Sequence, residues 1–260
     1  MSTLTAALSM AYKLNLLVMG EPRHWVHARP AMQFAVMASL GLLAVAAVSS
    51  FVFEEPGGAG VLVASLFHAF ASGVAWNAMR TSYHHPTIGA CNTVTLVRLV
   101  LTSVLVGALF DVVQVPWALF ALACAAFVLD GADGWLARRE GRVSSFGARF
   151  DVEVDSVLAL ALAIHAFQSG TLGVYVLFLG LPRYVFLVAQ LPFPWLSKDL
   201  PERFARKLVC VVQIATLLFL VSPLADAVGF GVAQGVAVIA VAALIWSFTR
   251  DIYWLWTRRG

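Results

Sequence analysis

Charged residues are scarce in this chain of 260 residues. Lys, Arg, Asp and Glu make up only 12% of it, whereas 61% of the residues are hydrophobic. A soluble domain normally carries about 25% charged residues, so the composition excludes an ordinary soluble protein and favours a polytopic membrane protein. The net charge is only +3, and no basic patch stands apart from the apolar runs. Nucleic-acid binding is therefore not expected.

Cysteine is also scarce, and this excludes two kinds of site. Cys91, Cys124 and Cys210 are far apart in the sequence, and none belongs to a CxxC pair. The chain thus supports neither a disulfide framework nor a zinc site. All three lie in or beside apolar runs, and we interpret them as small buried apolar side chains.

Long apolar runs, by contrast, are abundant. A bilayer core about 30 Å thick is crossed by about 20 mostly apolar helical residues. The predicted spans are residues 31–53, 58–79, 93–111, 115–136, 147–168, 171–192, 206–225 and 229–250. The runs are continuous, whereas membrane strands alternate between apolar and polar residues. We expect an all-α membrane protein with about eight transmembrane helices.

Basic residues are distributed unevenly among the connections between these spans. Residues 54–58, 111–116, 169–171 and 222–229 contain no Lys or Arg, and all the basic residues lie in the other connections, their flanks and the termini. The positive-inside rule places this second set in the cytoplasm. The prediction is a multi-pass protein of the cytoplasmic (inner) membrane, with both termini cytoplasmic. Residues 1–30 are interpreted as an amphipathic segment on the membrane surface.

Four aspartates lie at the cytoplasmic ends of the fourth and fifth predicted spans. Asp130 and Asp133 are three residues apart, and Asp151 and Asp155 are four apart, so each pair occupies one helical face. Carboxylates that converge from two neighbouring helices repel one another, and a divalent cation removes the repulsion. Carboxylate oxygens suit Mg²⁺ or Mn²⁺, and Mg²⁺ usually shares its shell with substrate phosphates. The pattern predicts a metal site for a phosphorylated substrate.

Small residues follow the first aspartate of this group. Gly131, Gly134 and Ala137 recur at steps of three, which leaves one side of the helix bare, so that a flat group can lie against the backbone. Gly147 begins the fifth span at a similar height, and Arg138 suits phosphate recognition because it always carries its charge. These residues predict a site for a nucleotide or another flat phosphorylated group.

The aspartates and small residues together resemble the signature of the CDP-alcohol phosphotransferases. The pattern reads Asp130-x2-Asp133-Gly134-x2-Ala137-Arg138-x8-Gly147-x3-Asp151-x3-Asp155, with every defining position filled. Upstream, Asn92-x2-Thr95-x2-Arg98 resembles the start of the family's first core helix, although the usual Pro before the Asn is Cys91 here. The resemblance divides the chain into the segment 1–30, two additional helices in 31–87, and a six-helix core in 88–260.

The resemblance implies a reaction and a set of roles. CDP-diacylglycerol would donate its phosphatidyl group to a small polar alcohol, and CMP would leave. Asp130, Asp133 and Asp151 would hold the metal, while Asp155 would share it and accept the proton of the acceptor hydroxyl. The CDP-lipid would be bound by Gly134, Ala137, Arg138 and Gly147. The family also implies a homodimer surrounded by membrane lipids.

The acceptor alcohol is predicted from basic residues. The candidates for its pocket are Arg149, Arg183, Arg206 and Lys207. A cationic pocket favours an acceptor that already carries phosphate. Lys207 and Gln213 also resemble part of a stretch in phosphatidylglycerophosphate synthases, although Cys210 replaces its Thr. Glycerol 3-phosphate is therefore the leading acceptor, inositol phosphate the second, and another polar head-group alcohol the remaining alternative.

Two other functions are compatible with acids inside membrane segments. A cation transporter also places carboxylates on adjacent helices, but the halves of the predicted spans remote from the aspartates are almost wholly apolar. A non-catalytic scaffold is disfavoured by the intact set of aspartates. His68 lies within a predicted span and is interpreted as a packed, hydrogen-bonded side chain, with proton relay as the alternative.

Overall fold

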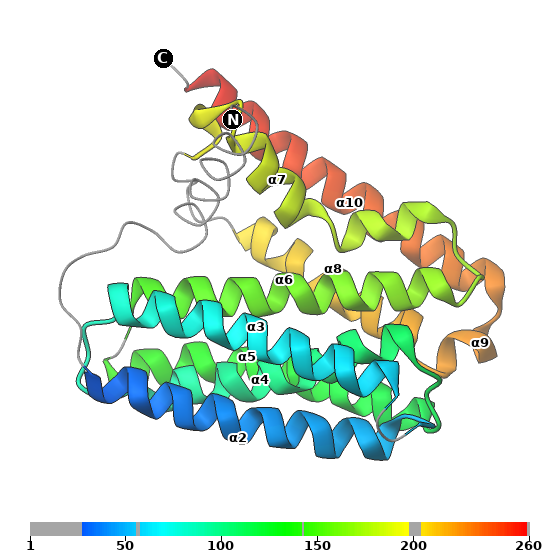
Figure 1. The fold of residues 1–260 in the computed structure, drawn as a ribbon. Helices are drawn as coiled ribbons and strands as arrows, with labels where there is room; N and C mark the ends of the chain where they lie inside the picture. Colours follow the sequence, from blue (N-terminus) through cyan, green and yellow to red (C-terminus); the bar gives the residue numbers. More distant parts are fainter. Residues whose placement is uncertain (1–27, 56–57, 142, 198–203, 259–260) are drawn as a thin grey trace, which may run out of the picture. The chain divides into compact units, whose positions relative to one another are not determined.

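The computed structural model describes residues 28–55, 58–141, 143–197 and 204–258, which form helices joined by short turns (Figure 1). This part of the chain contains no strand beyond an isolated antiparallel bridge between Phe53 and Val113. The predicted all-α class is confirmed, because the continuous apolar runs fold as helices. The interfacial segment predicted at residues 1–30 lies almost wholly outside the described residues.

The chain forms two compact units, Met1–Leu158 and Ala159–Gly260. The first unit contains α2 (Ala28–Val52), α3 (Ala59–Ser82), α4 (Gly89–Gly107), η1 (Ala108–Phe110), α5 (Pro116–Glu140) and the first part of α6 (Ser145–Gln168). The second contains the rest of α6, η2 (Val174–Leu179), α7 (Pro182–Gln190), η3 (Pro194–Ser197), α8 (Phe204–Val221), α9 (Leu224–Val228) and α10 (Phe230–Thr257).

Helices long and apolar enough to cross a membrane occur in both units. Among the described residues they are Arg29–Val52, Ala59–Ser82, Gly89–Phe110, Pro116–Glu140 and Phe230–Thr257. These five correspond to the predicted spans at 31–53, 58–79, 93–111, 115–136 and 229–250. The polytopic membrane architecture is therefore confirmed.

The remaining three predicted spans differ from single apolar membrane helices. Residues 147–168 lie in α6, a helix of 24 residues whose first half carries the charged side chains. Residues 206–225 correspond to α8, which ends at Val221, just before Ser222 and Pro223. The span at 171–192 is divided into η2 and α7.

The division between η2 and α7 has a local cause. Pro182 stands at the start of α7 and has no backbone N–H to continue a preceding helix. Gly180 passes so close to α6 that an added Cβ would lie 2.7 Å from the Cα of Leu160. The chain therefore breaks where it packs most tightly.

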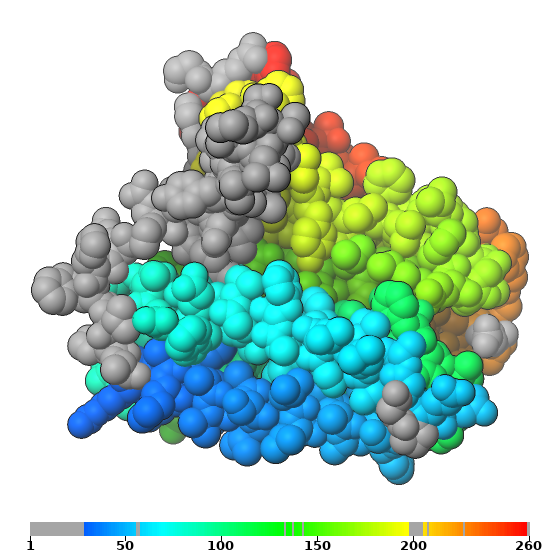
Figure 2. All heavy atoms as spheres, viewed as in Figure 1, coloured from blue at the N-terminus to red at the C-terminus, as the bar shows by residue number. Residues whose placement is uncertain are grey.

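Helices α2 and α3 pack on α4 and expose an apolar face. In Figure 1, α2, α3, α4 and α5 run side by side, and Figure 2 shows the surface that α2 and α3 contribute. Met32, Val36, Leu40 and Leu43 follow one another at helical spacing along α2 and are all at least 60% exposed except Val36, at 56%. An exposed apolar stripe of this kind suits contact with lipid.

Buried polar contacts join these helices at the end of α4 remote from the aspartates. His68 of α3 is fully buried, with Nε2 3.1 Å from the carbonyl oxygen of Ala38 and Nδ1 3.5 Å from Ser103 Oγ. The prediction of a packed, hydrogen-bonded histidine is confirmed. At the start of α3, the backbone N–H of Gly60 donates to Asp111 Oδ2 at 3.2 Å, which ties α3 to the turn after η1.

An aromatic cluster links α2 and α3 to the start of α6. The ring of Phe34 meets those of Phe146 and Phe150 edge-on, with centroids 6.3 and 5.8 Å apart. Tyr83 packs on Phe146 at 5.7 Å and donates its hydroxyl to the carbonyl of Ile88. Because α6 also carries Asp151, α2 and α3 support a helix of the candidate site.

The three cysteines differ in environment. Cys91 is buried, Cys124 is half-buried, and Cys210 is exposed on α8. The prediction that all three are buried is wrong for Cys210, because its side of α8 faces outward in an apolar stretch. A polarisable, weakly polar thiol is compatible with both environments.

Candidate active site

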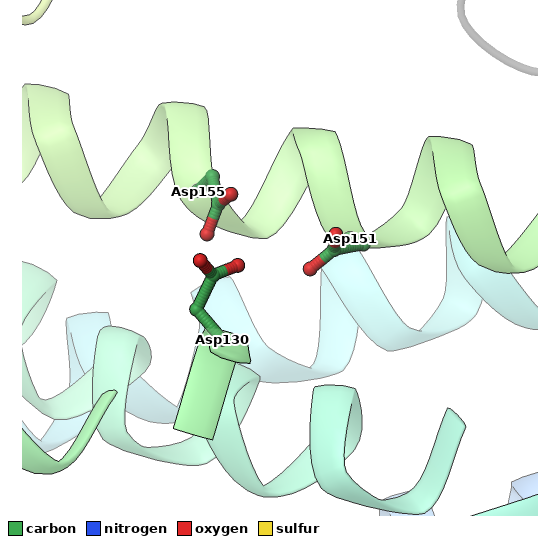
Figure 3. A group of neighbouring side chains, drawn as sticks. All are labelled: Asp130, Asp151 and Asp155. Carbon is green, nitrogen blue, oxygen red and sulfur yellow. The ribbon is translucent and has the colours of Figure 1, made fainter. Parts of the chain in front are cut away.

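Three of the four aspartates converge between α5 and α6. Figure 3 shows Asp130 of α5 pointing toward Asp151 and Asp155, which lie one turn apart on α6. One carboxylate oxygen from each lies within 4.8 Å of the other two. The side chain of Asp133 lies outside the described side chains. Asp151 and Asp155 share one face of α6 because they are four residues apart, and this face is turned toward Asp130 of α5.

The start of α6 is defined by a serine. Ser144 Oγ accepts the backbone N–H of Gly147 at 3.0 Å, as an N-cap side chain does for the third residue of a helix. This cap sets where the helix begins, and so directs Asp151 and Asp155 one and two turns later to the same face. The loss of the cap would free an unsatisfied donor at the edge of the site.

A buried arginine of α4 lies among the aspartates. The side chain of Arg98 is 0% exposed, and its Nη2 lies 3.1 Å from Asp130 Oδ1. Its Nη1 donates to Asp151 Oδ1 and its Nη2 to Asp155 Oδ1. Its Nε donates to the backbone carbonyl of Ala126 at 3.2 Å, one turn before Asp130 on α5. One guanidinium thus ties together the three helices that form the site.

The sequence analysis placed Arg98 only in the motif of the first core helix. A signal was present, because a charged residue within a predicted span is costly unless it is paired inside the protein. Three carboxylates and one guanidinium leave an excess of negative charge within this group of four side chains. The carboxylates remain open to solvent, with side-chain exposures of 38%, 31% and 40% for Asp130, Asp151 and Asp155. Accessible, negatively charged oxygen ligands fit a divalent cation.

A cavity of about 410 Å³ adjoins the aspartates. Its lining comprises Cys91, Asn92, Thr95, Gly134, Arg138, Val143, Ser144, Gly147, Ala148 and Asp151. The volume lies in the range of small-ligand and cofactor sites, which is about 300–1,000 Å³. Gly134, Arg138 and Gly147 were predicted to line a CDP site, and all three border this cavity, whereas the side chain of Ala137 lies outside the described side chains.

The two glycines of the cavity serve different purposes. A Cβ added to Gly147 would lie 3.0 Å from Asn92 Oδ1 and 3.1 Å from Ser144 Oγ, so this glycine permits a close approach of α4 and α6. A Cβ at Gly134 would meet only Arg138 Nη1, at 3.5 Å. Gly134 therefore leaves space in the cavity, as the bare side of the helix predicted.

Asn92 is buried within α4 and does not cap it. Its Nδ2 donates to the carbonyl of Ile88 at 2.7 Å, which directs Oδ1 toward Gly147. The start of α4 is held from both sides, since Gln33 Oε1 accepts the N–H of Ile88 and Glu140 Oε2 accepts that of Ala90, each at 3.1 Å. Asn92 and Thr95 thereby become cavity residues, a role the motif alone did not assign.

The predicted acceptor residues belong to different units. Arg149 lies on α6 in the first unit, and Arg183 and Arg206 lie on α7 and α8 in the second. Arg206 Nη1 is 3.6 Å from Asp251 Oδ2, a buried acid of α10 that the sequence analysis did not single out. The side chain of Lys207 is outside the described side chains. A shared acceptor pocket of these residues stays a prediction.

Comparisons with known proteins agree with the motif. Residues 89–246 match the CDP-alcohol phosphatidyltransferase family, from α4 to most of α10. A probable phosphatidylglycerophosphate synthase of Mycobacterium tuberculosis (strain CDC 1551 / Oshkosh) is 32% identical over 161 residues, which cover 59% of this chain and 73% of the relative. The counterpart from strain ATCC 25618 / H37Rv has the same values. The chain belongs to the CDP-alcohol phosphatidyltransferase family and is a membrane enzyme of phospholipid biosynthesis.

Proposed function

We propose that this enzyme transfers a phosphatidyl group from CDP-diacylglycerol to glycerol 3-phosphate with the help of Mg²⁺ or Mn²⁺, releasing CMP. The observation that carries the proposal is the junction of the aspartate group with the cavity: Asp151 belongs to both. A nucleotide diphosphate in the cavity would therefore bring its phosphates to the aspartates.

The donor would be held by the chain's small residues and Arg138. Gly134 leaves room for a flat group against α5, and Arg138 at the cavity wall supplies a permanent charge for phosphate. Asn92 and Thr95 of α4 add polar groups to the lining. We extend the CDP site, first proposed for Gly134, Ala137, Arg138 and Gly147, to these two residues of α4.

The aspartates would hold the metal and move the proton. Asp130, Asp133 and Asp151 are the proposed ligands, shared by Asp155, and a bound ion would stabilise the charge on the transferring phosphoryl group. Asp155 lies one turn beyond Asp151 and does not line the cavity among the described residues. An acceptor approaching on that side presents its hydroxyl to Asp155, which takes the proton as the oxygen attacks phosphorus and the bond to CMP breaks.

The acceptor is proposed from charge and from the named relatives. Arg149, Arg183, Arg206 and Lys207 supply positive charge for the phosphate of glycerol 3-phosphate. Inositol phosphate is the alternative. We further propose that residues 88–260 form the core, that residues 31–87 are an addition to it, that the site faces the cytoplasm, and that the enzyme is a homodimer.

The test is CMP release by the purified full-length protein with CDP-diacylglycerol. The assay uses Mg²⁺ or Mn²⁺ and offers glycerol 3-phosphate, inositol phosphate, inositol, serine or choline separately. Release with glycerol 3-phosphate alone supports the proposal. Release with a different acceptor replaces the acceptor but keeps the reaction. No metal-dependent release with any of them would favour a scaffold or a cation transporter.

A further inference from the structure

Arg98 has no role in the reaction proposed above, yet its side chain is fully buried, unlike the other charged side chains described in the first unit. Its side chain is 0% exposed and reaches the Oδ1 atoms of Asp130, Asp151 and Asp155. An arginine inside an apolar helix is expensive to bury unless its charge is paired. Its burial among three acids therefore requires an explanation of its own.

Two features show that the guanidinium is built into the site. The hydrogen bond from Nε to the carbonyl of Ala126 orients the group through the backbone of α5, independently of the carboxylates. The two terminal nitrogens then contact acids of two different helices, Asp130 of α5 and both acids of α6. The planar fork of Arg suits such divergent contacts, and a lysine ammonium does not reproduce them.

The guanidinium and a divalent cation would compete for the same carboxylates. Arg98 contacts Oδ1 of each aspartate, and these residues form the group whose oxygens are close enough to hold one ion. Two positive charges a few ångströms apart also repel each other, most strongly where burial limits screening. Arg98 therefore stabilises the carboxylates and disfavours the ion by the same contacts.

We propose that Arg98 is the resident counter-cation of the aspartate group. It holds the three carboxylates together when no metal ion is bound, and it lowers the affinity of the site for a divalent cation. The inference rests on the proposed metal dependence of the site. It goes beyond that proposal because it predicts that removing the charge of Arg98 raises the affinity for a divalent cation. Removing a residue that merely orients metal ligands would lower this affinity.

The experiment measures Mn²⁺ binding to the purified full-length protein, with unbound Mn²⁺ counted by electron paramagnetic resonance. Arg98→Gln removes the charge, Arg98→Lys keeps it without the fork, and Arg80→Gln removes an exposed arginine that stacks on Trp76 instead. We expect the Kd for Mn²⁺ to fall by at least about tenfold in Arg98→Gln. Arg98→Lys should lie between that value and the wild type, and Arg80→Gln should match the wild type.

Thermal unfolding of the same proteins gives a second readout without activity. In EDTA, Arg98→Gln should unfold at a lower temperature than the wild type, because its carboxylates repel one another. Saturating Mn²⁺ should reduce or abolish this difference in unfolding temperature. An ion that binds only the folded state stabilises it, and the variant is expected to bind the ion more tightly. A difference that stays the same in EDTA and in Mn²⁺ would indicate a purely structural arginine and overturn the inference.

The remaining outcomes separate the inference from the proposed function. If the wild type binds Mn²⁺ and Arg98→Gln binds it more weakly, Arg98 orients ligands and the inference is wrong, while the metal site stands. If Mn²⁺ binds the wild type and Asp151→Asn equally, the metal site itself is wrong, and the inference with it. Should Arg98→Gln fail to fold, Arg98→Lys decides: tighter binding than the wild type supports the inference, and equal or weaker binding overturns it.

Discussion

Two buried polar groups on α4 differ in a way that separates function from structure. Five residues apart, Arg98 meets three aspartates and Ser103 meets His68. His68 and Ser103 are both buried. The ring nitrogens of His68 lie beside the hydroxyl of Ser103 and the backbone carbonyl of Ala38, which are uncharged groups. In the aspartate group three carboxylates surround the one guanidinium of Arg98, and these carboxylates reach solvent. A balanced polar group fastens helices together, whereas an unbalanced and accessible one is suited to bind charged ligands.

The largest expected effect tests the unbalanced group. Asp155→Asn should lower turnover by about 10²–10⁴-fold, the usual contribution of a general base, because the amide cannot take the acceptor proton. The fold should persist, since the volume hardly changes. The measurement is CMP release together with thermal unfolding.

A matched control for this change lies at the other end of the first unit. Asp111→Asn removes the same charge from a residue that holds the N–H of Gly60. It should keep wild-type turnover and lose a little stability. Wild-type turnover in Asp155→Asn would instead remove Asp155 as the base.

The next effect extends the comparison to the basic residues of the second unit. Lys207→Ala should raise the KM for glycerol 3-phosphate by about tenfold, as expected for the loss of one charge-assisted contact of roughly 1.5 kcal/mol or more. The KM for CDP-diacylglycerol should change little. Arg258→Ala, which removes an exposed cation stacked on Trp254, is the control and should change neither. Equal effects of Lys207→Ala on both substrates would move the acceptor pocket elsewhere.

A smaller effect tests how closely α4 and α6 must approach. Gly147→Ala would place a Cβ against Asn92 Oδ1 and Ser144 Oγ, so the cavity should change shape and the KM for CDP-diacylglycerol should rise several-fold. Gly73→Ala adds the same methyl group to α3 in open space, away from the cavity lining, and should stabilise the helix by about 0.5–1 kcal/mol. Similar steady-state kinetics for the two variants would show that the close approach is not needed for donor binding.

The smallest effect on turnover is expected for the balanced group. Ser103→Ala removes the hydroxyl that lies beside His68 and donates to the carbonyl of Leu99, and it should cost about 1–2 kcal/mol of stability. CMP release should remain at the wild-type rate. Denaturant unfolding measures the free energy of unfolding. If turnover fell by more than the fraction of unfolded protein, the group of His68 and Ser103 would not be purely structural, and the distinction between the two groups would be wrong.

The sequence predicted that the aspartates converge, but it did not predict that Arg98 pairs with them. The convergence of the aspartates could be predicted, because helical periodicity is local and the two helices that carry Asp130, Asp151 and Asp155 are adjacent in the chain. Arg98 could not be assigned to them, because the pairing joins residues 32 to 57 positions apart. Its placement depends on the packing of α4 against α5, which no local pattern encodes.

Helix interruptions show the same division. Apolar runs predicted α2, α3, α4, α5 and α10 well, because a long apolar segment has few alternatives to a helix in lipid. The run at 171–192 contains Gly180 and Pro182, and its division into η2 and α7 follows from the tight packing of Gly180 on α6 together with the missing N–H of Pro182. The sequence contains both residues, but the interruption of the helix at these positions also requires the packing of Gly180 on α6.

What the sequence alone determined is therefore the class of protein, the membrane helices and the family motif with its aspartates. Each of these depends on composition or on spacing within one helix, and both can be read directly along the chain. The tertiary structure decided that Arg98 joins the aspartates, that Asn92 lies over Gly147, and that Phe34 packs on the helix bearing Asp151 and Asp155. These contacts join helices distant in sequence, and their free energy arises only when the helices pack together.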